Sequence, residues 1–176
     1  MITSTQTLLD EFIDKATHAH VTVHRVDDFH KIPQLIGTLV DADSTIVSAK
    51  TQPLTQLDWG QHTISDDIMA SNDGISLTEA HCGIAETGTL MMCSSATSPT
   101  SLNFLPLIQF VCLDTTKIVA TYEDAWQRVN QQGRLPRCVN FITGPSCTGD
   151  IEQEILWGAH GPKTLHLILY QHQESL

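Results

Sequence analysis

The stretch that most constrains the fold of this chain runs from residue 144 to residue 170 and reads GPSCTGDIEQEILWGAHGPKTLHLILY. The apolar run CVNFI at residues 138–142 precedes it and predicts a buried strand, because it is rich in β-branched and aromatic side chains. Turn-forming residues follow, and Asp150 is a favourable N-cap for a helix that ends at Gly158. A second buried strand is predicted at residues 165–170. The stretch therefore predicts strand, loop, helix and strand, the crossover that a parallel sheet requires.

The loop at residues 144–148 also indicates a binding site. Backbone N–H groups at a strand-to-helix junction are unpaired, and the helix dipole favours an anion there. In open α/β sheets, ligands bind beyond the carboxyl ends of the strands. The alternative is that the Gly and Pro residues only shape a turn and that Asp150 only caps the helix.

A second unusual stretch is HCGIAETGTL at residues 81–90. Gly83 and Gly88 bracket a single acidic residue, Glu86, just before a buried strand predicted at residues 90–94. An acid in such a turn is either a helix-terminus cap or a catalytic carboxylate. Since charged residues are mostly exposed, a cap or a surface acid is the default interpretation.

The rest of the chain alternates helical and strand patterns, which predicts an α/β fold of three layers, α/β/α, with a mostly parallel sheet. Strands are predicted at residues 21–26, 45–49, 75–80, 107–113 and 118–120. Helices are predicted at residues 7–16, from Asp28 with Ile32, Leu35, Ile36, Leu39 and Val40 inward, and at residues 123–132 with Ala125, Trp126 and Val129 inward.

Length and charge limit the class of protein. A chain of 176 residues predicts a single domain over residues 1–176, with a short N-terminal helix within residues 5–20. The net charge of −11 argues against nucleic acid or anionic lipid as a partner. The N-terminus lacks the basic region of a signal peptide, and no apolar run is long enough to span a membrane, so we expect a cytoplasmic protein.

The five cysteines provide no CxxC spacing. The chain by itself therefore lacks the pattern of an iron–sulfur or zinc site, and we expect no metal site in it. The nine histidines include no HExxH motif and are interpreted as scattered surface residues.

Three blocks together resemble one known family: GIAETGTL (83–90), GPSCTGDIE (144–152) and GAHGPKTLHLILY (158–170). They are similar to the lactate-utilisation protein C family (LutC/YkgG), the LUD domain, over roughly residues 20–172. The resemblance implies a fold like that of the NagB/RpiA/CoA-transferase group. It also implies an accessory subunit that works beside two iron–sulfur proteins, LutA and LutB, in the oxidation of L-lactate to pyruvate. The clusters are then expected on those partners, and no cofactor is expected on this chain.

The chain departs from the family pattern at Cys147 and at Gly149, where Ala is usual. Cys147 stands where the motif more often has Arg or another residue, and if that side chain meets an anion in the family, this chain has lost the contact. The chain also starts later than many members, which implies that an N-terminal docking extension is absent.

The candidate site combines the motif residues into one cleft with two walls. Glu86 is the candidate nucleophile or base, and His160 is the histidine within a family motif, where it either binds ligand or packs near a helix end. The first wall is Thr87, Gly88 and Thr89, and the second is Gly144, Pro145, Ser146, Thr148, Asp150 and Glu152.

Three functions stay open at this point. The first is the accessory subunit of a lactate-oxidising iron–sulfur system, with a cleft for a small anion. The second is a stand-alone enzyme that acts on a carboxylate, a CoA thioester or a sugar phosphate. The third is a ligand-binding or regulatory module without turnover. The enzyme requires Glu86 and the 144–148 loop to face one cleft at one edge of the sheet.

Overall fold

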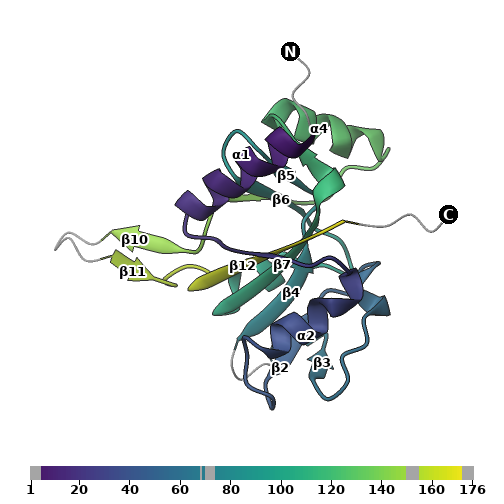
Figure 1. The fold of residues 1–176 in the computed structure, drawn as a ribbon, viewed down its shortest axis with the longest axis vertical. Coiled ribbons are helices and arrows are strands. Elements are labelled where there is room, and N and C mark those ends of the chain that lie inside the picture. The colour runs from purple at the N-terminus through teal and green to yellow at the C-terminus, as the bar shows by residue number, and fades with distance from the viewer. Residues whose placement is uncertain (1–4, 68, 70–73, 150–154, 172–176) are drawn as a thin grey trace.

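The chain forms a central sheet of six parallel strands with helices on both sides (Figure 1). The computed structural model describes residues 5–67, 69, 74–149 and 155–171. In spatial order the strands are β1 (Thr22–Arg25), β12 (Thr164–Tyr170), β7 (Ile108–Asp114), β4 (Ile75–Glu79), β2 (Thr45–Ser48) and β3 (Thr63–Ser65).

The two long strands β12 and β7 lie between β1 and β4 in this sheet and pair along their whole length, with Val111 opposite Leu167. Val111 and Leu167 are fully buried, as are Phe110 and Ile168. Strands buried on both faces need nearly continuous apolar sequence, which explains why these two runs are so easily recognised in the chain.

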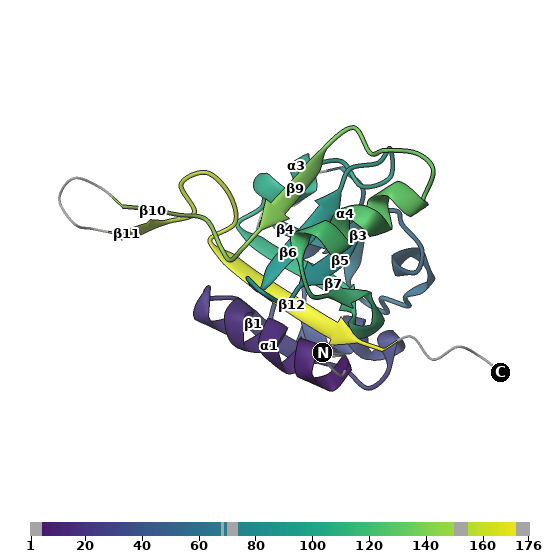
Figure 2. The same ribbon diagram turned by 90° about the horizontal axis from the view of Figure 1, so that it is seen from above.

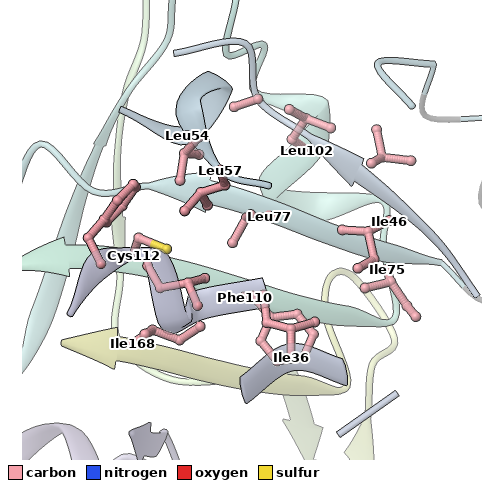
Figure 3. Packing of buried hydrophobic residues seen from close by; sticks show 14 of the residues in the cluster. Ile36, Ile46, Leu54, Leu57, Ile75, Leu77, Leu102, Phe110, Cys112 and Ile168 are labelled. Carbon is pink, nitrogen blue, oxygen red and sulfur yellow. The ribbon is translucent and has the colours of Figure 1, made fainter. Parts of the chain in front are cut away.

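One face of the central sheet is covered by short helical segments. Phe110, Leu77 and Ile36 meet in this layer (Figure 3). Asp28 caps the first of these segments, because its side chain accepts a hydrogen bond of 2.9 Å from the backbone N–H of His30. The segments are η1 (Phe29–Lys31), α2 (Ile32–Gly37), η2 (Leu54–Gln56) and α3 (Ser101–Phe104).

The opposite face is covered by α1 (Thr5–His18) and by a second, four-stranded sheet (Figures 1 and 2). Phe12 of α1 and Leu90 of the second sheet both pack in the cluster that contains Val111 and Leu167. The second sheet has the order β8 (Ile118–Val119), β5 (Cys82–Ile84), β6 (Thr89–Cys93) and β9 (Val139–Ile142). A 3₁₀ turn, η4 (Thr115–Lys117), joins β7 to β8.

Helix α4 (Tyr122–Gln131) covers the outer side of the second sheet. Its buried residues Ala125 and Val129 pack on Ile84 and Met91. A capping box starts it, in which the Thr121 hydroxyl accepts from the N–H of Asp124. Successive residues of β6 face opposite sides of the second sheet, so Leu90 packs toward the central sheet and Met91 packs toward α4.

The mostly parallel sheet with flanking helices is confirmed, as are the predicted strands in β1, β2, β4, β7, β8 and β12. The helices predicted at residues 7–16 and 123–132 and the cap at Asp28 are also confirmed. Two inward-facing assignments are wrong, because Leu39 is 40% exposed and Trp126 is 41% exposed. The α2 helix ends at Gly37, before Leu39, so the helical stripe no longer applies there.

The helix predicted between Asp150 and Gly158 is wrong over the part that the structure describes. Residues 155–157 instead form β11 (Ile155–Trp157), which pairs antiparallel with β10 (Cys147–Gly149). Asp150 itself lies outside the described residues. The hairpin extends away from the body of the molecule (Figure 2).

The position of β9 explains this error. It is an edge strand of the second sheet and only partly buried, so the segment that leads to β12 crosses between sheets and needs no crossover helix. The unbroken apolar triplet at 155–157 is then free to pair as a strand.

We expect Phe12→Ala to lower the free energy of unfolding by about 3–5 kcal/mol, because the ring is fully buried between α1 and the central sheet. The matched control is Leu105→Ala, since Leu105 is 64% exposed and should change stability by less than about 0.5 kcal/mol. Urea denaturation measures both, and equal small losses would contradict this packing of α1.

Candidate functional site

A cavity of about 760 Å³ lies where the carboxyl end of β4 meets the second sheet and α4. Glu79 is the last residue of β4, and His81 follows it just before β5. Cys93, at the end of β6, and Thr51, shortly after β2, also line the cavity. The cavity is thus at the edge of the parallel sheet where ligands of open α/β proteins bind.

Positive charge is concentrated in this cavity. Lys117, Arg128, Arg134 and Arg137 line it, which is four of the nine Lys and Arg residues in a chain of net charge −11. A cleft lined by one sign of charge focuses its field on a ligand of the opposite sign. Arg guanidinium groups also present paired N–H donors that match a carboxylate or phosphate. The cavity is therefore chemically suited to a small anion.

The single carboxylate in the cavity wall is held by two partners. Lys117 Nζ donates to Glu79 Oε1 at 2.7 Å, and the Tyr170 hydroxyl donates to the same oxygen at 3.3 Å. Only 10% of the Glu79 side chain is exposed. Burial, with the adjacent Glu79 charge, raises the pKa of Tyr170, so this phenol stays a donor. Glu79 is therefore ordered and its charge is matched locally by Lys117.

Three buried polar atoms in the cavity wall have no hydrogen-bond partner within the part of the chain that the structure describes. They are Thr51 Oγ1, His81 Nε2 and Arg128 Nε. Burial, and then the charges of Arg128 and Lys117, lower the pKa of His81, so its imidazole is neutral at neutral pH. An unsatisfied buried polar atom costs about 1–3 kcal/mol.

The thiols near the cavity are unreactive in their present surroundings. Burial raises the pKa of Cys93 to about 11 and that of Cys82 to about 12. Since the thiolate is the nucleophile, neither is activated for covalent chemistry.

The two turns of the predicted cleft do meet, but at the end of the second sheet opposite the cavity. The hydroxyls of Thr89 and Thr143 lie 2.5 Å apart, and the Thr87 hydroxyl donates to Thr89 Oγ1 at 2.8 Å. Strand β5 leaves the cavity at His81 and β6 returns to it at Cys93, so the turn between them is remote from it. None of the predicted site residues that the structure describes lines the cavity.

Glu86 is exposed and acts as a cap. Its Oε1 accepts a hydrogen bond of 3.0 Å from the backbone N–H of Tyr122, the first residue of α4. This geometry matches the helix-terminus interpretation of the motif. Its catalytic role stays a prediction.

Gly88 and Gly144 hold the two turns against the end of α1. Gly88 has φ +67°, and a Cβ there would overlap the backbone nitrogen of Ala16. Gly144 has φ +95°, and a Cβ there would overlap the carbonyl oxygen of Ala19. The motif glycines are therefore needed for close approach of backbone to backbone.

The other predicted wall is tied to the amino end of β12. Ser146 N–H donates to the Pro162 carbonyl at 2.8 Å, and Gly158 N–H donates to the Ser146 carbonyl at 2.8 Å. The N–H of His160 reaches Ser146 Oγ at 3.3 Å, and the His160 side chain is exposed. Pro145 lies in the same loop, Thr148 lies in β10, and Asp150 and Glu152 lie outside the described residues. The ligand-binding role of these residues stays a prediction.

Sequence reasoning missed the residues around the cavity. One signal was present, since three of the nine cations fall within residues 128–137. The contribution of Glu79 and His81 could not be found this way, because it depends on how the second sheet folds back over the end of β4.

Within the described residues, no helix is both long and apolar enough to cross a membrane. That same part of the chain contains no group of three or more His, Cys, Asp or Glu residues placed to hold a metal ion.

We expect Gly88→Ala to lower the free energy of unfolding by about 1–3 kcal/mol more than Gly133→Ala does. Both glycines have positive φ, +67° and +71°, but a Cβ at Gly133 meets nothing within 4 Å. The control therefore carries the backbone strain without the overlap against α1. Urea denaturation of both variants tests this, and equal losses would remove the packing role of Gly88.

We expect Glu86→Ala to cost about 1 kcal/mol of stability, because it removes the acceptor of the Tyr122 N–H at the start of α4 while the capping box of Thr121 and Asp124 stays in place. Glu86→Gln keeps an acceptor oxygen and should cost about 0.5 kcal/mol. Thermal unfolding gives both values. If Glu86→Gln instead left stability unchanged but abolished function in the assays below, the catalytic interpretation would be supported over the cap.

Comparisons with known proteins agree with this fold and with the sequence motifs. An uncharacterized protein of Neisseria meningitidis serogroup B is 37% identical over 100 residues, covering 56% of this chain and 42% of that protein. The protein named Lactate utilization protein C of Shouchella clausii is 35% identical over 91 residues, 50% of this chain and 40% of that protein. The protein of that name from Anoxybacillus flavithermus is 30% identical over 113 residues, 63% of this chain and 51% of that protein.

The chain thus spans about half the length of the curated relatives it matches. Among solved structures, a DUF162 family protein from Deinococcus radiodurans superimposes with a TM-score of 0.69 at 22% identity, covering 95% of this chain and 98% of that one. This likeness concerns the fold. The model of the LUD domain matches residues 9–170, and the chain belongs to the LUD domain family.

Proposed function

We propose that this chain takes part in lactate utilisation as a subunit that binds a small anion in the cavity at the carboxyl edge of the central sheet. Relatives in the same family carry the name Lactate utilization protein C, which supports the pathway. The observation that carries the binding proposal is the gathering of four of nine cations around one cavity in an acidic chain.

The ligand class follows from the charge and size of the cavity. Lactate and pyruvate are carboxylates, and a carboxylate can accept paired hydrogen bonds from a guanidinium such as that of Arg134 or Arg137. A cavity of about 760 Å³ is larger than a three-carbon acid needs. It therefore also accommodates a larger carboxylate or a phosphorylated compound.

The redox chemistry of this system is proposed to lie on partner proteins similar to LutA and LutB, which carry the iron–sulfur clusters. The support is the motif resemblance in residues 83–90, 144–152 and 158–170. In this arrangement the chain supplies binding and positioning, and the partners supply electron transfer.

A second candidate function is an enzyme in its own right. It is favoured by one observation, the presence of a carboxylate and a neutral imidazole, Glu79 and His81, in the same cavity. Such a pair can move a proton between a bound substrate and the protein. Product formation from a bound carboxylate by the purified chain would favour this function over the subunit.

The test of binding is calorimetric titration of the purified chain with L-lactate, pyruvate and inorganic phosphate. We expect at least one to bind, and the double variant Arg134→Gln/Arg137→Gln to weaken that binding by about tenfold or more, because each lost charged hydrogen bond is worth about 1.5–3 kcal/mol. Both arginines are exposed, so the fold should survive. Arg25→Gln, on the exposed end of β1, is the matched control for loss of one charge.

The pathway is tested by deleting the gene in the organism of origin. Growth on L-lactate should fail, should return with the wild-type gene or Arg25→Gln, and should not return with Arg134→Gln/Arg137→Gln. Normal lactate growth of the deletion strain would overturn the pathway assignment. If the double variant fully restores growth, the cavity is not needed for lactate utilisation and the binding proposal is wrong.

A further inference from the structure

The cavity wall concentrates unpaired polar atoms. Three of its residues, Thr51, His81 and Arg128, each have a buried side-chain atom without a hydrogen-bond partner among the described residues. Arg128 Nε–H can only donate, and the Thr51 hydroxyl can donate. His81 Nε2 donates whenever the imidazole is protonated. These three residues line one cavity together with the cations Lys117, Arg134 and Arg137, which makes it a site for a negatively charged group.

The backbone that carries His81 and Arg128 is held by buried neighbours. The N–H of His81 donates to the Met91 carbonyl at 2.8 Å, and the residues on either side of His81, Ala80 and Cys82, are 1% and 0% exposed. Arg128 precedes Val129, which is fully buried beneath α4. Little ordering of the chain is then required when a ligand enters.

The charged residues that line the cavity with His81 come from several elements, and Arg128 and Lys117 act on His81 directly. Lys117 comes from η4, Arg128 from α4, and Arg134 and Arg137 from the segment after α4. The negative charge in the cavity wall is Glu79 of β4, which already binds Lys117 and the Tyr170 hydroxyl. Cys93 is a neutral thiol because burial raises its pKa to about 11. The surroundings of His81 are thus positive and resist its protonation while the cavity has no anion.

We propose that the cavity binds a small dianion between Arg128 and His81, and that the His81 imidazole takes up a proton as the anion enters. This inference rests on the proposed anion-binding function and names the proton that accompanies the ligand. An arriving anion offsets the positive charges of Arg128 and Lys117 that act on His81. This favours the imidazolium, which then adds its own charge to the site.

The direction of the pH dependence follows from linkage. The pKa of His81 is lowered in the free protein by burial and by Arg128 and Lys117, and it rises when the anion is bound. Affinity is therefore greatest below the free-state pKa and falls as pH rises through the higher bound-state pKa. Between the two pKa values it falls by up to about tenfold per pH unit, the limit for one proton.

The experiment is calorimetric titration with oxalate, which keeps two negative charges between about pH 5.5 and about pH 8, the range in which histidine changes charge. Titrations at one pH in two buffers of different ionisation enthalpy give the number of protons taken up. We expect an uptake that approaches one proton, with affinity falling as pH rises. Oxalate binding without proton uptake overturns the inference and leaves the proposed anion site standing.

Two variants with matched controls assign the proton. His81→Asn should abolish the uptake and flatten the pH dependence, whereas His30→Asn, at an exposed position outside the cavity, should leave both unchanged. Arg128→Gln should weaken oxalate binding by about tenfold or more, and Arg25→Gln should not. Unchanged uptake in His81→Asn overturns the inference.

If His81→Asn does not fold, NMR titration of the wild-type imidazole with and without oxalate gives the same decision. The pKa of His81 must be higher with oxalate, and an equal or lower value overturns the inference. Failure of oxalate to bind the wild-type chain also overturns it, whereas the proposed function falls only if L-lactate, pyruvate and phosphate fail as well.

Discussion

Everything in this molecule depends on the burial of β7 and β12 on both faces. These strands carry apolar side chains alternately up and down, so two separate layers must cover them. The short helices that contain Ile36 and Leu102 cover one face, and α1 with the second sheet covers the other. The second sheet is part of this cover, because Leu90 and Met92 of β6 pack in the same cluster as Leu113, Leu169 and Phe12 of α1.

The cavity is a consequence of the same arrangement. Strand β4 ends at Glu79, and the chain turns through His81 directly into the second sheet, which places the end of one sheet beside the end of the other. Helix α4 closes the outer side and delivers Arg128 and the residues after it. Backbone groups at the ends of parallel strands and side chains from a covering helix therefore meet in one hollow, as in other open α/β sheets.

The parts of this fold that could be predicted from sequence are those set by local patterns. The apolar runs of β7 and β12, the cap at Asp28 and the capped helix α4 are all recognisable without coordinates. The hairpin of β10 and β11 was not, because an apolar triplet after an N-cap residue fits a helix as well as a strand.

The candidate site shows the same limit. Family motifs directed attention to Glu86 and to the loop around Ser146, which the structure places in contacts that join elements of the fold. The cavity residues lie far apart in the chain, from Thr51 to Arg137, and only the folding of β5 and β6 over β4 brings them together. Sequence motifs with fixed spacing cannot predict such a long-range arrangement. The three arginines within residues 128–137 were the one feature of this site that could be seen in the sequence.

The segregation of charge in this chain has a consequence for how an anion reaches the cavity. The five Lys and Arg residues that do not line the cavity are outnumbered by the 20 Asp and Glu residues of the chain. An approaching anion is therefore repelled at long range and attracted only close to the entrance. At physiological ionic strength the Debye length is about 8 Å, so salt screens the distant repulsion more than the local attraction. Moderate salt should thus accelerate the encounter, the reverse of the usual behaviour of oppositely charged partners.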